Sequence, residues 1–144
     1  TLDRSSAASD VYKRQFLSGA KSAYEMILLA FERGDLSEVR GFLAPAVAEA
    51  FDGVIADRKA RGLTTEAQFL GTRETALAAA EFNPQTRLAE LSVRIVGEMI
   101  VATRDEQGNV VDGDPRSARK QRDVWTFARQ MGSSDPNWQL VATA

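Results

Sequence analysis

One stretch near the C-terminus decides the fold: Asp123-Val-Trp-Thr-Phe-Ala-Arg-Gln-Met131, Gly-Ser-Ser-Asp-Pro136, Asn-Trp-Gln-Leu-Val-Ala-Thr143. In its first part, Trp125 and Phe127 alternate with smaller or more polar residues, which is the period of two expected of a pleated strand. The glycine, serine and proline cluster in the middle favours neither helix nor strand, so the chain must reverse there. Both tryptophans, Trp125 and Trp138, are therefore expected on one β-hairpin. Its large aromatic face needs a core of helices or a ligand.

The composition is that of one folded domain that needs no disulfide. The chain has 144 residues, 44% of them apolar and 26% charged, which is enough to bury a core. It contains no cysteine and no histidine, so thiol nucleophiles, Ser-His-Asp arrangements and zinc sites built on those residues are excluded. The net charge of −2 argues against a dedicated nucleic-acid-binding protein. We expect no metal and no cofactor.

Three helices are predicted in the first half of the domain. Residues 1–15 show no sustained apolar period and are interpreted as a disordered leader or an artefact, so the single domain is expected to span residues 16–144. From Phe16 to Phe31, apolar residues recur every three or four positions, which predicts the first helix. The capping-box spacing of the segment 35–38 predicts a second, and Pro45 marks the start of a third that ends near Gly62.

The second half of the domain is predicted to form an antiparallel sheet. Residues 64–82 are rich in alanine and fit a helix as well as a strand, and we assign a strand to the part from 71 to 82. Gly97 interrupts the next strand and predicts a bend or a bulge there. Residues 104–115 are expected to form a polar loop. The four predicted strands are 71–82, 87–103, 120–131 and 137–143.

Two clusters of basic residues are candidates for contact with an anionic surface. The first stands at the end of the predicted third helix and comprises Arg58, Lys59 and Arg61, where positive charge also complements the helix dipole. The second precedes the hairpin and comprises Arg116, Arg119, Lys120 and Arg122. Near an anionic membrane, each such residue contributes about 1 kcal/mol. The alternative for both clusters is that the basic side chains are simply solvated and contact no partner.

Asp123 is the acid that strand parity places on the same face as Trp125 and Phe127. Desolvation there raises the pKa of a carboxyl group and suits it to proton transfer, whereas an edge carboxylate in water is the simpler alternative. A small pocket enzyme of isomerase or dehydratase type, with Asp123 as base and Tyr24 as hydrogen-bond donor, is therefore one hypothesis.

Four segments of the chain together resemble one family. They are Phe-Leu-Ser-Gly-Ala-Lys-Ser-Ala-Tyr-Glu (16–25), Ala-Phe-Glu-Arg-Gly-Asp-Leu (30–36), Gly-Asn-Val-Val-Asp-Gly-Asp-Pro (108–115) and the hairpin with its two tryptophans. Their order and spacing resemble the Tim44-like domain, the C-terminal module of the membrane-docking subunit of the mitochondrial inner-membrane import motor, and especially its bacterial relatives. The resemblance covers residues 16–144.

The resemblance implies an α+β fold in which N-terminal helices pack on a curved four-stranded antiparallel sheet, like the cone of nuclear transport factor two and the cystatins. It implies a non-enzymatic scaffold or adaptor at a site of protein translocation or membrane-protein assembly, on the cytoplasmic face of an inner membrane, as the soluble domain of a longer protein. The implied partners are anionic lipids and proteins of that machinery, with homo-oligomers as a further possibility. An apolar pocket between helices and sheet is expected, lined by Tyr24, Phe31, Phe51, Ile95, Trp125 and Phe127.

Overall fold

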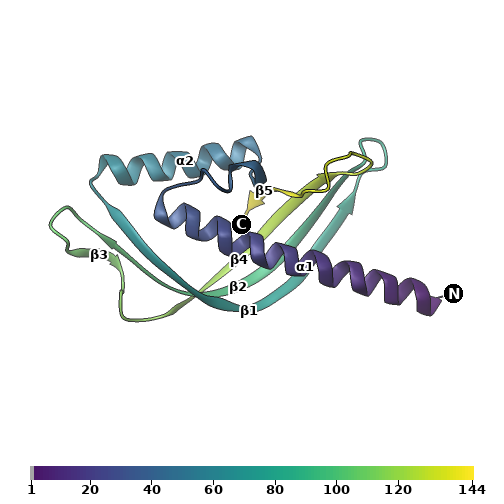
Figure 1. The fold of residues 1–144 in the computed structure, drawn as a ribbon, viewed down its shortest axis with the longest axis horizontal. Coiled ribbons are helices and arrows are strands. Elements are labelled where there is room, and N and C mark those ends of the chain that lie inside the picture. Colours follow the sequence, from purple (N-terminus) through teal and green to yellow (C-terminus); the bar gives the residue numbers. More distant parts are fainter. Residues whose placement is uncertain (1) are drawn as a thin grey trace.

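The structure is a computed structural model that describes the backbone of residues 2–144 and the side chains of residues 10–144. Within this range, two α-helices and one short 3-10 turn accompany a five-stranded sheet (Figure 1). The helical elements are α1 (Leu2–Arg33), η1 (Arg40–Phe42) and α2 (Pro45–Ala60). The strands are β1 (Thr64–Phe82), β2 (Leu88–Arg104), β3 (Val110–Gly113), β4 (Arg119–Gln130) and β5 (Gln139–Thr143). The α+β class is confirmed, with five strands in place of the expected four.

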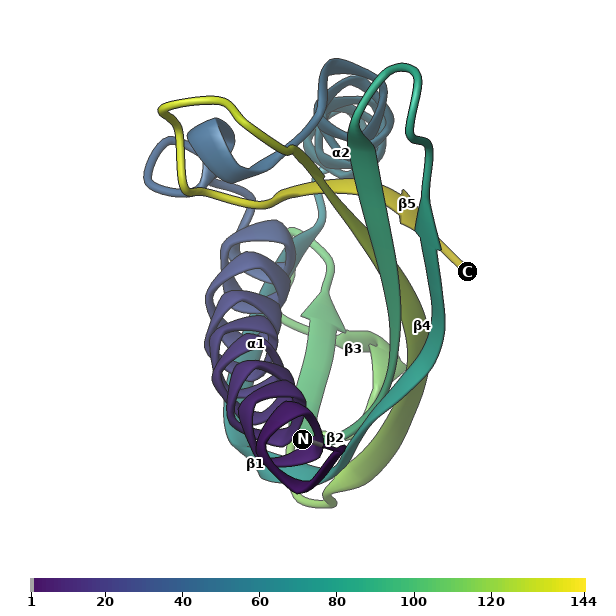
Figure 2. The same cartoon turned by 90° about the vertical axis from the view of Figure 1, so that its right-hand side faces the viewer.

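The sheet is antiparallel throughout and curves around α1. Its strand order is β1-β2-β4-β5, and β3 pairs with the end of β2. Figure 2, a view turned by 90°, shows the long strands bending around the helix. The register between β1 and β2 shifts at three places, where Leu70, Arg73 and Ala78 are inserted as extra residues. Such bulges bend a strand and increase its twist, so they account for the curvature.

A bulge does occur at Gly97, but its extra residue lies on the neighbouring strand. Gly97 pairs with Thr72 and Val96 pairs with Glu74, so Arg73 of β1 is inserted beside Gly97. On its other side, Gly97 pairs in register with Gln121 of β4. A Cβ atom added at Gly97 would lie 3.1 Å from Cε2 of Tyr24 and 3.3 Å from Cε2 of Phe69. The missing side chain therefore makes room for the Tyr24 ring on the sheet, which is the close approach that glycine also permits inside a strand.

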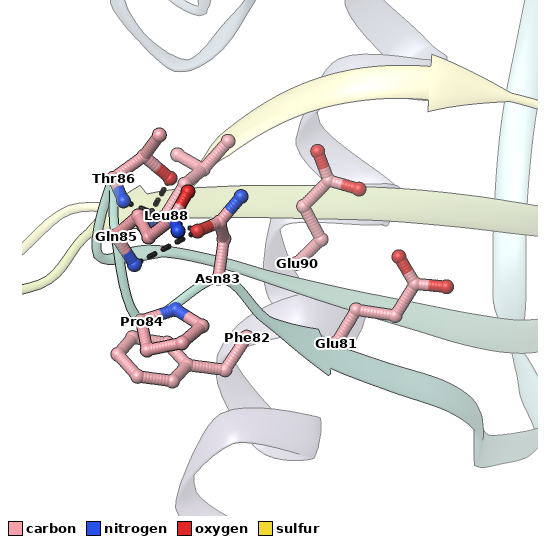
Figure 3. A pocket seen from close by; sticks show the side chains of 8 residues that line it. All are labelled: Glu81, Phe82, Asn83, Pro84, Gln85, Thr86, Leu88 and Glu90. Carbon is pink, nitrogen blue, oxygen red and sulfur yellow. Dashed lines mark hydrogen bonds between the residues drawn. The ribbon is translucent and has the colours of Figure 1, made fainter.

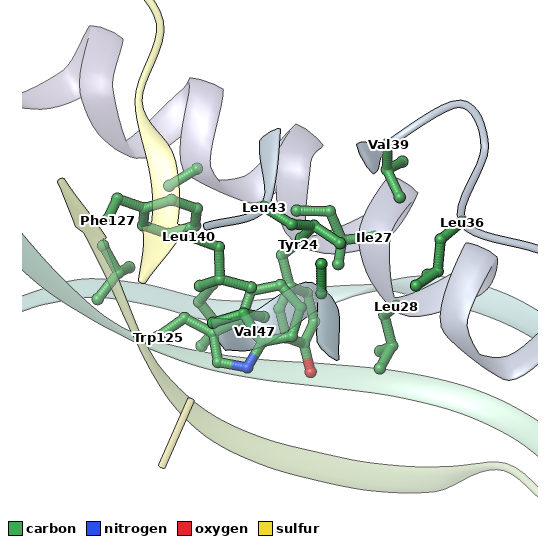
Figure 4. Close-up of a cluster of buried hydrophobic side chains, with 14 of the residues drawn as sticks. Tyr24, Ile27, Leu28, Leu36, Val39, Leu43, Val47, Trp125, Phe127 and Leu140 are labelled. Atoms are coloured by element: carbon green, nitrogen blue, oxygen red, sulfur yellow. The ribbon is translucent and has the colours of Figure 1, made fainter. Parts of the chain in front are cut away.

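The core lies between α1 and the concave face of the sheet (Figure 4). Ala20, Tyr24, Ile27 and Leu28 are buried at helical spacing on α1. The sheet supplies Val93, Ile95, Met99 and Val101 from alternate positions of β2, with Trp125 and Phe127 from β4. The aromatic hairpin thus finds the helical partner that its pattern required.

The first helix is longer than predicted. Backbone residues 2–15 are helical, because this segment contains no glycine or proline to interrupt the helix that continues to Arg33. Within it, the described side chains of residues 10–15 are exposed, which explains the missing apolar period. Whether residues 1–15 are a leader outside the domain stays a prediction, and Thr1 lies outside the described residues.

The predicted second helix is wrong. Asp35 begins a tight turn in which its Oδ1 accepts a hydrogen bond from the backbone N–H of Ser37 at 3.0 Å, and only the 3-10 turn η1 follows. Gly41 and the approach to Pro45 leave no room for a longer helix. The apolar residues of this segment are nevertheless core residues, because Leu36, Val39 and Leu43 are all buried.

The remaining elements agree with the sequence to within a few residues, with one omission. Proline at the first turn starts α2 as predicted, and β1 extends the predicted strand back to Thr64. The short strand β3 lies inside the segment expected to be a loop. It has only four exposed residues, among them Val110 and Val111, so it lacks the alternating burial that marks longer strands.

Candidate binding groove

The two tryptophans of the hairpin occupy different environments. Trp125 is buried in the core, where its ring lies 4.6 Å from the ring of Tyr24. Trp138, just before β5, is half-buried and meets Phe16 of α1 edge-on, with ring centroids 5.1 Å apart. Phe16 also packs against Phe127 at 6.1 Å. The hairpin therefore contributes one tryptophan to the core and one to the surface beside the N-terminal half of α1.

Tyr24 and Asp123 form the polar contact between α1 and the middle of the sheet. The Tyr24 hydroxyl donates a hydrogen bond of 2.6 Å to Oδ2 of Asp123, which also accepts one of 3.2 Å from the Gln121 side chain. Tyr24 is completely buried. Burial raises the pKa of its phenol above the usual range, and the hydrogen bond to Asp123 and the negative charge of that carboxylate raise it further. Neither residue lines a described hollow.

Most of the residues predicted to line a pocket pack inside the core. Tyr24, Ile95 and Trp125 are buried there, and Ile95 stands directly opposite Asp123 in the sheet. Phe31 and Phe51 pack against each other at 4.7 Å and join α1 to α2. Only Phe127 also borders an open hollow. In the described part of the chain, Tyr24, Ile95 and Trp125 thus form core contacts between α1 and the middle of the sheet.

An apolar groove of about 900 Å³ opens instead beside the N-terminal half of α1. Its apolar walls come from α1, η1 and the ends of the long strands, and they comprise Phe16, Leu17, Ala20, Ala23, Phe42, Leu77, Leu91 and Phe127. The connection between β4 and β5 adds Met131, Pro136 and Trp138. The charged residues that line it are Lys13 and Arg129. Small residues on α1, among them Gly19, leave this space open.

Sequence reasoning missed this groove, although one signal pointed to it. The apolar face of α1 carries large side chains at Tyr24, Ile27 and Leu28. Toward the N-terminus it carries the small residues Ala20 and Ala23. A helix that presents small residues opposite an aromatic strand cannot fill the space between them. The signal becomes readable only when the register shows that Phe127 and Leu91 stand opposite each other.

A second hollow, of about 690 Å³, surrounds the turn between β1 and β2 (Figure 3). Asn83 shapes this turn, because its Oδ1 accepts hydrogen bonds from the backbone N–H groups of Gln85 and Thr86. Glu81 and Glu90, which pair across the two strands, are its charged residues. This hollow is the open surface of a turn and offers no converging set of functional groups.

The first basic cluster is mostly engaged in structural contacts. Arg58 places its guanidinium 4.7 Å from the centre of the Phe31 ring and forms a 3.5 Å ion pair with Glu32. It also donates to the backbone carbonyls of Phe31 and Glu32, at the end of α1. Arg61 pairs with Asp57 in the exposed last turn of α2, and Lys59 is exposed.

Glu32 is the buried acid of this region. Burial raises the pKa of its carboxyl. The positive charges of Arg58 and Arg119 lower that pKa, and the negative charge of Asp112 raises it. The Glu32–Arg58 pair therefore joins the end of α1 to α2, close to the start of β4.

The second basic cluster is open to solvent. Arg116, Arg119, Lys120 and Arg122 are all exposed, and none forms an ion pair with the side chains described for residues 10–144. They occupy the connection from β3 and the first residues of β4 (Figure 1). The groove lies toward the other end of that strand, where Phe127 and Arg129 line it.

Neither a metal centre nor a membrane span is found in the part of the chain that the structure describes. No three acidic side chains there come together as metal ligands would, and no helix is long and apolar enough to cross a bilayer.

Comparison with known proteins defines the class of this fold. The model of the Tim44-like domain matches residues 6–144, so the chain belongs to the Tim44-like domain family. Members of this family are membrane-associated domains linked to protein translocation, and they are generally scaffolds rather than enzymes.

A solved structure with a similar fold is the intermembrane space region of the chloroplast protein ARC6. The superposition has a TM-score of 0.55 at 10% sequence identity and covers 85% of this chain and 88% of the other. At that identity the likeness concerns the fold alone. Among curated proteins, none matches this sequence.

Proposed function

We propose that this domain is a non-enzymatic scaffold that attaches to an anionic membrane surface and presents an apolar groove to a lipid or a peptide. Its place is a site of protein translocation or membrane-protein assembly, on the cytoplasmic face of an inner membrane. The family supports the membrane setting. The observation that carries the proposal is the exposed basic run of residues 116–122, none of whose cations forms an ion pair with the described side chains.

The charges around this run determine how strong the attachment is. Asp112 and Asp114 precede the run directly, so the local field is only moderately positive. Lys59 and Arg61 add to it, because α2 ends at the same end of the molecule as β3 and the start of β4 (Figure 1). We expect weak attachment that weakens further as salt screens exposed charges over about 10 Å at 0.1 M ionic strength.

Vesicle flotation tests this function. The protein is expected to float with vesicles that contain anionic phospholipid, to stay behind with neutral ones, and to lose binding at high salt. The triple variant Arg116→Gln, Lys120→Gln, Arg122→Gln should lose most of the binding. The matched control Arg14→Gln, Lys21→Gln, Arg33→Gln removes three exposed cations from α1 and should keep it. Equal failure of the unaltered protein with both kinds of vesicle would refute the proposal.

The two residues of the small-enzyme hypothesis, Tyr24 and Asp123, line neither of the two hollows described above. An acid–base pair must reach its substrate, but Tyr24 is completely buried and packs against Trp125. The contact with Asp123 is a structural tie between helix and sheet, and we do not propose catalysis there.

Self-association stays a prediction of its own. Light scattering across a range of protein concentration measures it, and a mass that does not rise with concentration argues against a homo-oligomer.

A further inference from the structure

We propose that the groove beside α1 binds one long-chain fatty acid, with the carboxylate held by Lys13 and Arg129. This inference names the ligand of the groove in the function proposed above and so depends on that part of it. The proposal is based on the shape of the groove, on its charges and on its position relative to the basic run.

The size and lining of the groove suit a single apolar chain. Its volume of about 900 Å³ lies toward the upper end of the ~300–1,000 Å³ typical of sites for small ligands. Its floor is formed by aromatic and aliphatic side chains, among them Phe16, Leu91 and Phe127. An extended peptide on these side chains would leave backbone N–H and C=O groups without partners, which is costly, whereas an acyl chain has no such groups.

The charged residues of the groove favour an anionic ligand. Lys13 and Arg129 are its only charged lining residues, and both are positive. Neither forms an ion pair with the side chains described for residues 10–144. Arg129 is oriented by a 3.3 Å hydrogen bond from its Nε to the backbone carbonyl of Asp135. Two such cations at an apolar groove complement one carboxylate, because charge-assisted hydrogen bonds to a carboxylate are the strong ones.

The position of the groove favours a free fatty acid over a phospholipid within the bilayer. The basic run is at the start of β4, whereas Phe127 and Arg129 are near its end. Ten residues separate Arg119 from Arg129 along the strand, which corresponds to roughly 30 Å at about 3.3 Å per residue. When the molecule stands on a membrane by the start of β4, with the strand upright, the groove is held away from the bilayer and a ligand reaches it through water.

Tryptophan quenching by a brominated fatty acid tests the proposal without any membrane. Trp138 lines the groove, whereas Trp125 is buried in the core, so brominated stearate below its aggregation concentration should quench Trp138 alone. Quenching should saturate at one ligand per protein and disappear in Trp138→Phe. Unbrominated stearate should compete, and its methyl ester should compete much less because it carries no charge.

Two sets of variants test the charge and the space separately. Lys13→Gln with Arg129→Gln should weaken binding by tenfold or more, since a hydrogen bond to a charged group contributes about 1.5–3 kcal/mol. Lys21→Gln with Arg33→Gln, which removes two exposed cations of α1 outside the groove, should leave it unchanged. Gly19→Leu should fill the groove and abolish binding. Gly53→Leu is its matched control, because both glycines are helical and exposed, with no described atom within 4 Å of an added Cβ.

The proposal is overturned if brominated stearate leaves Trp138 unquenched, or if the Lys13/Arg129 variant or Gly19→Leu binds like the unaltered protein. If flotation persists in that case, only the ligand assignment has failed. If stearate binds but the protein ignores anionic vesicles, the membrane function has failed and the fatty-acid site stands.

Discussion

The hydroxyl of Tyr24 donates a 2.6 Å hydrogen bond to Oδ2 of Asp123, joining two residues that are 99 positions apart in the sequence. This contact fixes the rotation of α1 over the sheet, because the Tyr24 ring fits only above the bare backbone of Gly97. This polar contact, at the edge of a mainly apolar core, specifies how helix and sheet meet.

Removing that hydroxyl should destabilise the fold. Tyr24→Phe keeps the ring but leaves Asp123 with only its longer bond to Gln121, and we expect a loss of about 1–3 kcal/mol in the free energy of unfolding. Urea denaturation followed by circular dichroism measures this loss. Tyr12→Phe is the control, since Tyr12 is 71% exposed and should change nothing. Equal stability of the Tyr24→Phe variant and the unaltered protein would show that the contact does not stabilise the fold.

Stability should fall in alkaline solution because of the same residue. The pKa of Tyr24 is raised in the folded state, so its proton is bound more tightly there than in the unfolded chain. Its contribution is complete below the ordinary tyrosine pKa of about 10 and is lost as the pH rises above it, by about 1.4 kcal/mol per pH unit. Unfolding free energies measured from about pH 8 to pH 11 should show this decline, and Tyr24→Phe should lack that component.

Replacing the arginine of the Glu32–Arg58 ion pair should lower the free energy of unfolding. Arg58→Leu leaves the buried carboxylate of Glu32 without its partner, and we expect a loss of about 3 kcal/mol, near the low end for a broken buried pair. Adding Glu32→Gln should restore part of that stability. The deficit should also shrink as the pH falls, because a carboxyl whose folded pKa is raised is favoured in its neutral form. Arg61→Leu, which breaks an exposed pair, should cost no more than about 0.5 kcal/mol.

A methyl group at Gly97 should overpack the contact between helix and sheet. The Cβ of Gly97→Ala would press against the rings of Tyr24 and Phe69, and overpacking of this kind costs about 1–3 kcal/mol. Thermal unfolding measures the change. If the variant is as stable as the unaltered protein, α1 can move away from the sheet more easily than this packing indicates.

Two helical glycines should give the opposite result. Gly19→Ala and Gly53→Ala each place a methyl group in open space on a helix, and each should stabilise the protein by about 0.5–1 kcal/mol. The gain should be similar in α1 and α2. A loss in either variant would mean that its glycine has a packing role that the structure does not show.

Local sequence patterns predicted most of the secondary structure. The alternation around Trp125 located β4, Pro45 located the start of α2, and the alternating apolar positions from Leu91 to Val101 located β2. These signals are readable because each depends on residues close together in the chain. The prediction failed where the signal is weak or non-local, as in the exposed β3 and in the polar N-terminal part of α1.

The sequence by itself determined the class of the fold, because the periods of two and of three to four residues dictate which faces must be buried. The tertiary structure alone decided where the core ends and the groove begins. Trp125 and Trp138 belong to the same hairpin. The curvature of the sheet and the small residues of α1 place Trp125 in the core and leave Trp138 lining the groove. A cavity is the space that distant side chains fail to fill, and no local pattern in the chain encodes that space.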